Sequence, residues 1–237
     1  MRTKLLLFLV TLSISFPSFS GNEIDTYPAF LENTSLDTET SFASYSVDIY
    51  NRINDNDLDF EAFKHGLKGF TKLQQEGKLT NNKYLTIIDM SISANTERFF
   101  IINMETYQLE HKSLVAHGKN TGGEYAKQFS NIVSSYKTSL GFYKTAETYT
   151  GKHGHSLRLD GLEFSNNKAR ERAVVIHEAK YVSNSYIQKN GRLGRSFGCP
   201  SLPKKNYKTI ISKIKNGSCL FIYYPEKNYL KKSKLVS

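Results

Sequence analysis

Cysteine is scarce in this sequence, and no long apolar run occurs after its first twenty residues. Cys199 and Cys219 are its only two cysteines, so the 237-residue chain can close at most one internal disulfide. A helix that crosses a bilayer needs about 20 predominantly apolar residues. No segment beyond residue 20 is long and apolar enough, so we expect no stable membrane insertion of that part of the chain.

Several motifs with a well-defined chemistry are also absent. There is no glycine-rich loop of the kind that cradles phosphate groups, and no basic–aromatic pattern specific to nucleic acid. No internal repeat is visible either. We therefore expect no cofactor and no nucleic-acid partner.

The first twenty residues have the layout of a secretory signal peptide. Arg2 and Lys4 form a basic start, an apolar run follows, and Ser18 and Ser20 stand at the −3 and −1 positions of a cut before Gly21. No cysteine lies near this cut, which excludes a lipoprotein anchor there. Removing both basic residues takes the net charge from +10 to +8 (10 − 2). We expect a basic protein that is exported to a periplasm or cell envelope. Its charge suits acidic surfaces, which include cell-wall polymers, membrane headgroups and nucleic acid, but it also suits simple solubility, and charge alone does not choose between these roles.

Residues 21–80 are predicted to form a flexible lead and an accessory helical hairpin. The stretch 21–37 is polar and irregular. Apolar side chains then recur every three to four residues over 38–53 and again over 60–73, as on amphipathic helices. Asp59 is placed to cap the second helix.

Residues 81–225 are predicted to form a mainly β domain, either a β-sandwich or a mixed sheet, with minor helices. A helix is expected over 203–215, and polar loops over 118–135 and 149–155. The predicted strands cover 84–90, 98–104, 109–117, 138–143, 157–162, 173–177 and 218–224. The lysine-rich end, 226–237, is expected to be solvated and mobile.

Cys199 lies in a segment, 191–201, that is shaped by three glycines and by Pro200. Glycine permits turns that other residues resist, and proline cannot continue a helix or donate a ladder hydrogen bond. Arg192 and Arg195 can hold the surrounding space positive, which lowers a thiol pKa. A reactive cysteine and a small buried core cysteine are both compatible with this pattern.

A reactive cysteine needs a base, and His177 is the strongest candidate among six histidines because it ends the apolar run 173–176. Such a strand end fixes the position of a side chain. Two alternatives remain open. A Cys199–Cys219 disulfide would abolish a nucleophilic role. A zinc site from His153, His155, His177 and Cys199 has suitable ligand types, but it lacks a standard spacing, so we expect no metal.

A longer set of motifs resembles the L,D-transpeptidase catalytic domain of bacterial cell-wall enzymes, and in particular its murein L,D-transpeptidase subfamily. The resemblance covers residues 84–224. The matching segments are Val115–Asn120, Phe129–Asn131, Ser139–Tyr143, Tyr149–Gly154, Ser156–Glu163, Arg172–His177 and Gly194–Pro200. Two positions depart from the broader family pattern: Glu178 stands where glycine is usual and Phe197 where histidine is usual. The Glu178 carboxylate is expected to raise the pKa of His177 or to reshape the pocket.

The resemblance implies a catalytic site with no metal. Cys199, as a thiolate paired with His177, would attack a peptidoglycan tetrapeptide stem and form a thioester, from which a second stem would take the acyl group in a 3→3 cross-link. The backbone N–H groups of Gly198 and Cys199 would form the oxyanion hole. The backbone carbonyl of Ser196 would orient the His177 ring.

The resemblance also suggests substrate contacts at His117, Tyr143, Arg158 and Arg195. The expected protein is a monomeric carbapenem target whose partners are peptidoglycan stem peptides. Two alternatives stay open at this stage. The same site would act as an L,D-carboxypeptidase or other hydrolase if water took the acyl group, and the chain would be a non-catalytic wall-binding module if the site were inactive.

Overall fold

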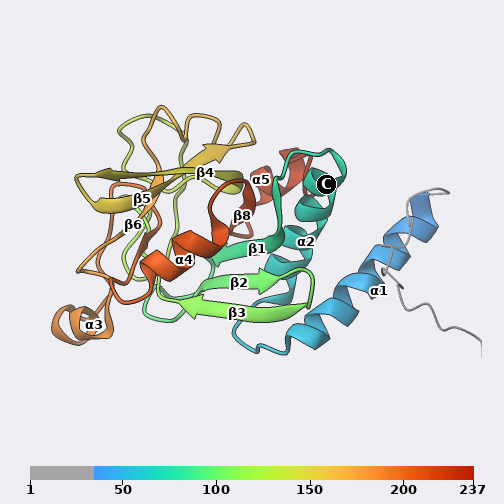
Figure 1. The fold of residues 1–237 in the computed structure, drawn as a ribbon, viewed down its shortest axis with the longest axis horizontal. Coiled ribbons are helices and arrows are strands. Elements are labelled where there is room, and N and C mark those ends of the chain that lie inside the picture. The colour runs from blue at the N-terminus through green and yellow to red at the C-terminus, as the bar shows by residue number, and fades with distance from the viewer. Residues whose placement is uncertain (1–34) are drawn as a thin grey trace, which may run out of the picture. The chain divides into compact units, whose positions relative to one another are not determined.

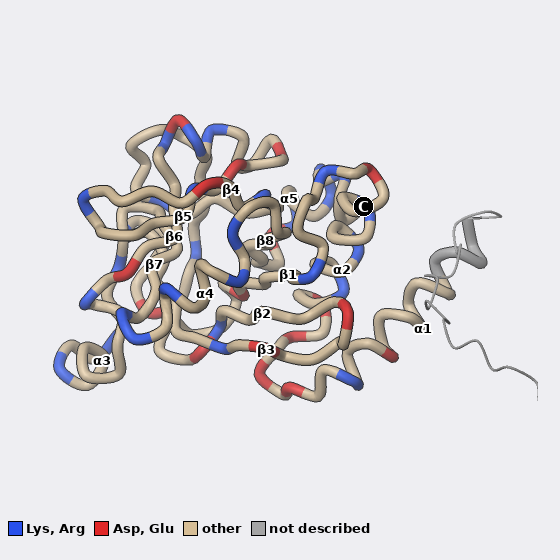
Figure 2. The backbone as a smooth tube through the Cα atoms, viewed as in Figure 1, with Lys and Arg blue, Asp and Glu red and all other residues tan. Residues whose placement is uncertain are grey.

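The computed structural model describes residues 35–237, so the predicted signal peptide and most of the predicted lead lie outside the described residues. Residues 41–237 cluster as one compact unit. Within the described part, no helix combines the length and the apolar character that a membrane span requires. Lys and Arg are distributed over many elements of the fold (Figure 2).

Two helices precede the sheet, as the apolar spacing predicts. They are α1 (Ser35–Ile53) and α2 (Phe60–Gln75). Asp59 caps α2 by accepting a hydrogen bond from the Ala62 N–H at 2.9 Å. Helix α2 packs closely on the sheet: a Cβ added to Gly69 would lie 2.1 Å from the Phe142 ring. The helices therefore belong to the main hydrophobic core, to which Ile49 of α1 also contributes.

Eight strands form one mixed sheet in the order β3-β2-β1-β8-β4-β5-β6-β7 (Figure 1). The pairs β1–β8 and β6–β7 are parallel, and the other pairs are antiparallel. The strands are β1 (Asn81–Asp89), β2 (Phe99–Asn103), β3 (Gln108–Ser113), β4 (Gly141–Gly151), β5 (Gly154–Gly161), β6 (Val175–Glu178), β7 (Ser201–Leu202) and β8 (Ser218–Tyr223). The predicted mainly β class with a mixed sheet is confirmed.

The central strand β8 is buried along its whole length, as its unbroken apolar run predicts. Three short helices complete the described fold: α3 (Asn184–Asn190), α4 (Tyr207–Ile214) and α5 (Lys227–Lys232). Helix α4 matches the helix expected over 203–215 and buries Ile210, Ile211 and Ile214. Helix α3 was not predicted, and none of its residues is buried.

The polar loop predicted over 149–155 is wrong. Strands β4 and β5 continue through this stretch and turn tightly, with Gly151 paired to Gly154. Gly154 adopts a φ of +73°, which glycine reaches without steric cost. Tyr149 and Thr150, which open this stretch, are residue types that favour strands, so the polarity of the stretch was the weaker signal.

The solvated, mobile end predicted for 226–237 is also wrong. Tyr229 of α5 is buried, and its hydroxyl donates to Oε2 of Glu163 at 2.7 Å. The Ser233 hydroxyl donates to the other oxygen of the same carboxylate. Leu235 and Val236 are buried as well. A few apolar and hydroxyl side chains thus attach a lysine-rich segment to the core.

Candidate functional site

The candidate site lies at the β7 edge of the sheet, where β6 and β7 run parallel. Register pairs His177 of β6 with Ser201 of β7, and Cys199 lies just before β7. Both cysteines are free thiols, and Cys219 is fully buried in β8. The Cys199 thiol is partly buried, with Sγ 3.7 Å from the carbonyl oxygen of Ala173.

The loop before Cys199 is held by the Ser196 side chain. The Ser196 hydroxyl donates to the Cys199 carbonyl oxygen at 2.6 Å and accepts the Gly198 N–H at 3.0 Å. Gly198 has a φ of +128°, a conformation that strongly favours glycine. The Gly198 N–H, an expected oxyanion-hole donor, is therefore already bonded inside the loop.

A second segment supports this loop from the side. Gly118 forms a β-bridge with Ser196, and its N–H donates to the Thr138 hydroxyl at 3.0 Å. The Ser196 carbonyl accepts the Lys119 N–H at 2.8 Å. That carbonyl was expected to orient His177, and this expectation is wrong. A Cβ at position 118 would lie 2.4 Å from the Tyr136 carbonyl oxygen and 3.1 Å from the Gly198 Cα, so the approach requires glycine.

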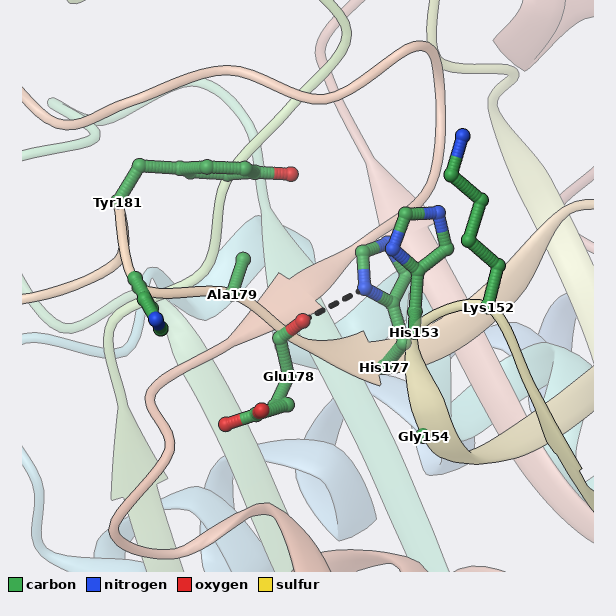
Figure 3. A pocket seen from close by; sticks show the side chains of 8 residues that line it. Lys152, His153, Gly154, His177, Glu178, Ala179 and Tyr181 are labelled. Atoms are coloured by element: carbon green, nitrogen blue, oxygen red, sulfur yellow. Dashed lines mark hydrogen bonds between the residues drawn. The ribbon is translucent and has the colours of Figure 1, made fainter.

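His177 is oriented instead by the backbone of its neighbour. Its Nδ1 lies 2.7 Å from the Glu178 carbonyl oxygen (Figure 3), and its Nε2 lies 3.0 Å from the Ser201 hydroxyl. A carbonyl oxygen can only accept, so Nδ1 carries the hydrogen and Nε2 is left as an acceptor. The Ser201 hydroxyl donates to that acceptor. Nε2 is thus bonded to Ser201 in this structure, where a direct Cys199 pair was expected.

The surroundings of His177 favour the neutral imidazole. Its pKa is lowered, mainly by burial, and the nearby His153 acts in the same direction. The His153 ring stacks on it with the centroids 4.4 Å apart. The Glu178 carboxylate acts on this pKa in the expected upward direction, but it points away from both imidazoles (Figure 3), and burial outweighs it.

A cavity of about 300 Å³ opens beside the two histidines. Tyr181 lies on the opposite side of this cavity (Figure 3). Its hydroxyl lies 3.1 Å from the Ser201 hydroxyl, which extends the hydrogen-bond chain from His177. Glu178 contributes a buried Oε2 with no hydrogen-bond partner among the described residues. The lining residues are Lys152, His153, Gly154, His177, Glu178, Ala179, Lys180 and Tyr181.

The cation that acts on Cys199 is Arg172. Burial raises the pKa of the Cys199 thiol, while a backbone hydrogen bond at Val175 and the Arg172 guanidinium lower it. Arg172 donates to the carbonyl oxygens of Ser130 and Lys137. The sequence assigned this positive charge to Arg192 and Arg195, which instead donate to backbone carbonyls, Arg192 to Leu193 and Arg195 to Lys119 and Gly122. Two signals pointed to Arg172: it directly precedes the apolar run before His177, and it begins the matching segment Arg172–His177.

Two of the four expected substrate contacts are buried inside the fold. Tyr143 is fully buried and donates to the Ser139 carbonyl at 3.0 Å. His117 is 1% exposed and lies between Arg98, at 2.8 Å from Nδ1, and the Gly123 carbonyl, at 3.1 Å from Nε2. Both side chains are internal hydrogen-bonding groups, so direct substrate contact is excluded in this structure.

Of the other two expected contacts, Arg195 donates to the Lys119 and Gly122 carbonyls, and Arg158 lies on β5. Its guanidinium pairs with Glu147 at 3.1 Å and covers the Tyr149 ring. These two contacts of Arg158 are with residues of β4, not with the loop that carries Cys199. Within residues 35–237, no group of three or more His, Cys, Asp or Glu side chains is arranged to hold a metal ion.

The structure is thus a mainly β protein in which a cysteine and a histidine that favours its neutral form lie on adjoining segments at the β7 edge of the sheet. A family model described as the L,D-transpeptidase catalytic domain matches residues 54–223, which is more than half of the chain. The chain therefore belongs to the L,D-transpeptidase catalytic domain family. No curated protein matches it.

The solved structures to which the chain is similar include the following three. An L,D-transpeptidase from Mycobacterium smegmatis shares 14% identity over 60% of this chain and 59% of its own, with a TM-score of 0.38. The helical cell shape determining protein Pgp2 from Campylobacter jejuni shares 14% identity over 69% and 56%, with a TM-score of 0.39. The L,D-transpeptidase LdtMt1, solved in complex with imipenem, shares 17% over 59% of each chain, with a TM-score of 0.36. The chain thus spans about three fifths of the length of these structures.

Proposed function

We propose that this protein is an exported, cysteine-dependent peptidoglycan L,D-transpeptidase that forms 3→3 cross-links through a thioester on Cys199. The observation that carries the proposal is the placement of Cys199 and His177 on the parallel-paired β6 and β7 edge of an L,D-transpeptidase catalytic domain. The tautomer of His177 supports it, because the Nδ1 contact to the Glu178 carbonyl leaves Nε2 without a hydrogen and so able to accept a proton.

In the first half-reaction, the Cys199 thiol gives its proton to Nε2 of His177 as sulfur attacks the carbonyl of the third stem residue. The bond from that carbonyl to the terminal D-alanine then breaks. The imidazolium returns the proton to the leaving amine, and a thioester remains. In the second half-reaction, an amine of another stem attacks the thioester, the C–S bond breaks, and the amine proton restores the thiol.

The proton path must involve Ser201, because its hydroxyl occupies Nε2 in the substrate-free structure. The hydroxyl either relays the thiol proton to Nε2 or gives way to the thiol when substrate binds. Catalytic hydrogen bonds commonly align only in the substrate complex. The raised pKa of Cys199 favours a neutral resting thiol, so deprotonation accompanies attack in this scheme.

The oxyanion is assigned to backbone donors of the Cys199 loop, with the Gly198 N–H available once it leaves the Ser196 hydroxyl. Arg172 supports the developing thiolate through its charge. No metal or cofactor takes part in this scheme. The substrate is a peptidoglycan tetrapeptide stem, which places the working enzyme in the cell envelope.

The test is incubation of the protein, without residues 1–20, with muropeptides bearing tetrapeptide stems, followed by mass analysis of the products. Cross-linked dimers support transfer, whereas tripeptides alone assign the same site to an L,D-carboxypeptidase. The matched controls are Cys199→Ala, which should abolish both products, and Cys219→Ala, which should retain them. If no product appears and Cys199 forms no carbapenem adduct, the enzyme proposal is wrong.

A further inference from the structure

An exposed group of three side chains lies beside the Cys199 loop and is not used by the scheme above. The Lys119 ammonium lies 4.3 Å from the ring centroid of Tyr136 and 4.7 Å from that of Phe197. The two rings contact each other with centroids 4.9 Å apart. Phe197 is 69% exposed and Tyr136 is 38% exposed, although both are large and could pack elsewhere. We refer to Lys119, Tyr136 and Phe197 as the ammonium cluster.

The backbone holds this cluster firmly against the nucleophile's loop. The Lys119 N–H donates to the Ser196 carbonyl at 2.8 Å, and the Asn120 N–H donates to the Tyr136 carbonyl at 3.1 Å. Tyr136 has a φ of 54°, an uncommon conformation for an aromatic residue. Such conformations persist where the surroundings enforce them, and they gather at binding sites. Phe197 is itself only two residues from Cys199.

The Lys119 charge is available to a ligand. Neighbouring guanidiniums are occupied by backbone carbonyls, as in the Arg195 bonds to the Lys119 and Gly122 carbonyls. Lys119 forms no salt bridge within the described part of the chain, and its recorded side-chain interactions are with the two ring faces. Ring faces attract the ammonium without neutralising its charge. They also limit its motion, so less conformational entropy is lost when a ligand binds.

The geometry points to Lys119 as the binding site for the terminal carboxylate of the donor stem peptide, and this inference rests on the proposed function. The leaving residue of a tetrapeptide stem is the terminal one, so its carboxylate lies about one residue, or roughly 3.8 Å in Cα spacing, beyond the scissile carbonyl. The ammonium cluster flanks the cysteine that attacks that carbonyl. A fixed cation there selects stems with a free carboxyl end over longer or capped stems.

The test measures binding without turnover, in a protein carrying Cys199→Ala. A tetrapeptide stem is compared as the free acid and as the C-terminal amide by titration calorimetry. Surface ion pairs contribute up to about 1 kcal/mol, so the acid should bind roughly fivefold tighter than the amide. Adding Lys119→Met should weaken binding of the acid by that factor and leave binding of the amide unchanged. Lys119→Arg should preserve the preference, and Lys127→Met, at another exposed lysine, should have no effect.

The third stem residue can supply a second carboxylate, so the test compares stems that differ at this residue. Stems with lysine there carry no side-chain carboxylate, whereas stems with diaminopimelate do. Persistence of the Lys119 effect with lysine-containing stems supports the terminal carboxylate. Its loss with those stems, an equal loss of acid and amide binding, or no loss at all overturns the inference. Because the assay needs no catalysis, absence of turnover would count against the proposed function alone.

Discussion

Replacing Gly118 by alanine should disable the Cys199 loop through packing alone. The added Cβ would lie 2.4 Å from the Tyr136 carbonyl oxygen and 3.1 Å from the Gly198 Cα. Ordinary contacts between heavy atoms need about 3.5 Å, so these backbones must separate by about 1 Å. Overpacking of this kind costs about 1–3 kcal/mol of stability. A misplacement of about 1 Å at a reacting group can lower the rate about 100-fold.

Gly123→Ala is the matched control, because a Cβ there meets nothing within 4 Å. Neither glycine has a positive φ, so backbone strain does not distinguish the two variants. The assays are thermal unfolding and the rate of Cys199 acylation by a carbapenem, followed by intact mass. Gly118→Ala should remain folded with a lowered melting temperature and acylate about 100-fold more slowly. Equal behaviour of the two variants would refute the role given to the 117–119 segment.

Three further predictions follow from buried groups. The fold lowers the pKa of His117 from 6.5 to about 4, so the unfolded chain takes up a proton at a higher pH than the folded chain does. The free energy of unfolding should therefore fall by about 3 kcal/mol as the pH drops from 6.5 towards 4. His117→Asn should flatten this pH dependence in urea titrations. Tyr229→Phe removes the hydroxyl bonded to Glu163 and should cost about 1–3 kcal/mol in the same titrations, and no loss would contradict the attachment of α5. Iodoacetamide should label Cys199 but not Cys219 in the folded protein, with a rate that still rises above pH 9 because burial raises the pKa of Cys199; unlabelled Cys199 would contradict its accessibility.

The elements that the sequence predicted best are those with a strong local signal. Strand β8 is specified by its unbroken apolar run. Helix α2 is specified by the spacing of its apolar residues and by its N-cap, Asp59. Neither signal refers to the rest of the chain. The run before His177 likewise predicts a strand end, and β6 ends one residue later, at Glu178. Periodicity and capping are local properties, so these predictions needed no tertiary information.

The parts that were missed depend on contacts between distant residues. The bond between His177 and Ser201 joins residues 24 apart and follows from the β6–β7 register, which no local pattern encodes. The Ser196 carbonyl was assigned to His177, but bridging to Gly118 takes it to the Lys119 N–H. Helix α5 is attached to the core by individual side chains such as Tyr229, which bonds to Glu163. The surrounding segment is rich in lysine, a composition that favours solvent exposure.

Trapping the acyl-enzyme tests the central claim most directly. The protein is mixed with a tetrapeptide stem, quenched in acid within a single turnover, and mapped by peptide mass analysis. The account predicts an added mass equal to that of the corresponding tripeptide stem minus one water, on the peptide that contains Cys199. It predicts no such adduct with Cys199→Ala. An adduct on Ser201 or on any residue other than Cys199, or turnover of the stem by the Cys199→Ala protein, would contradict it.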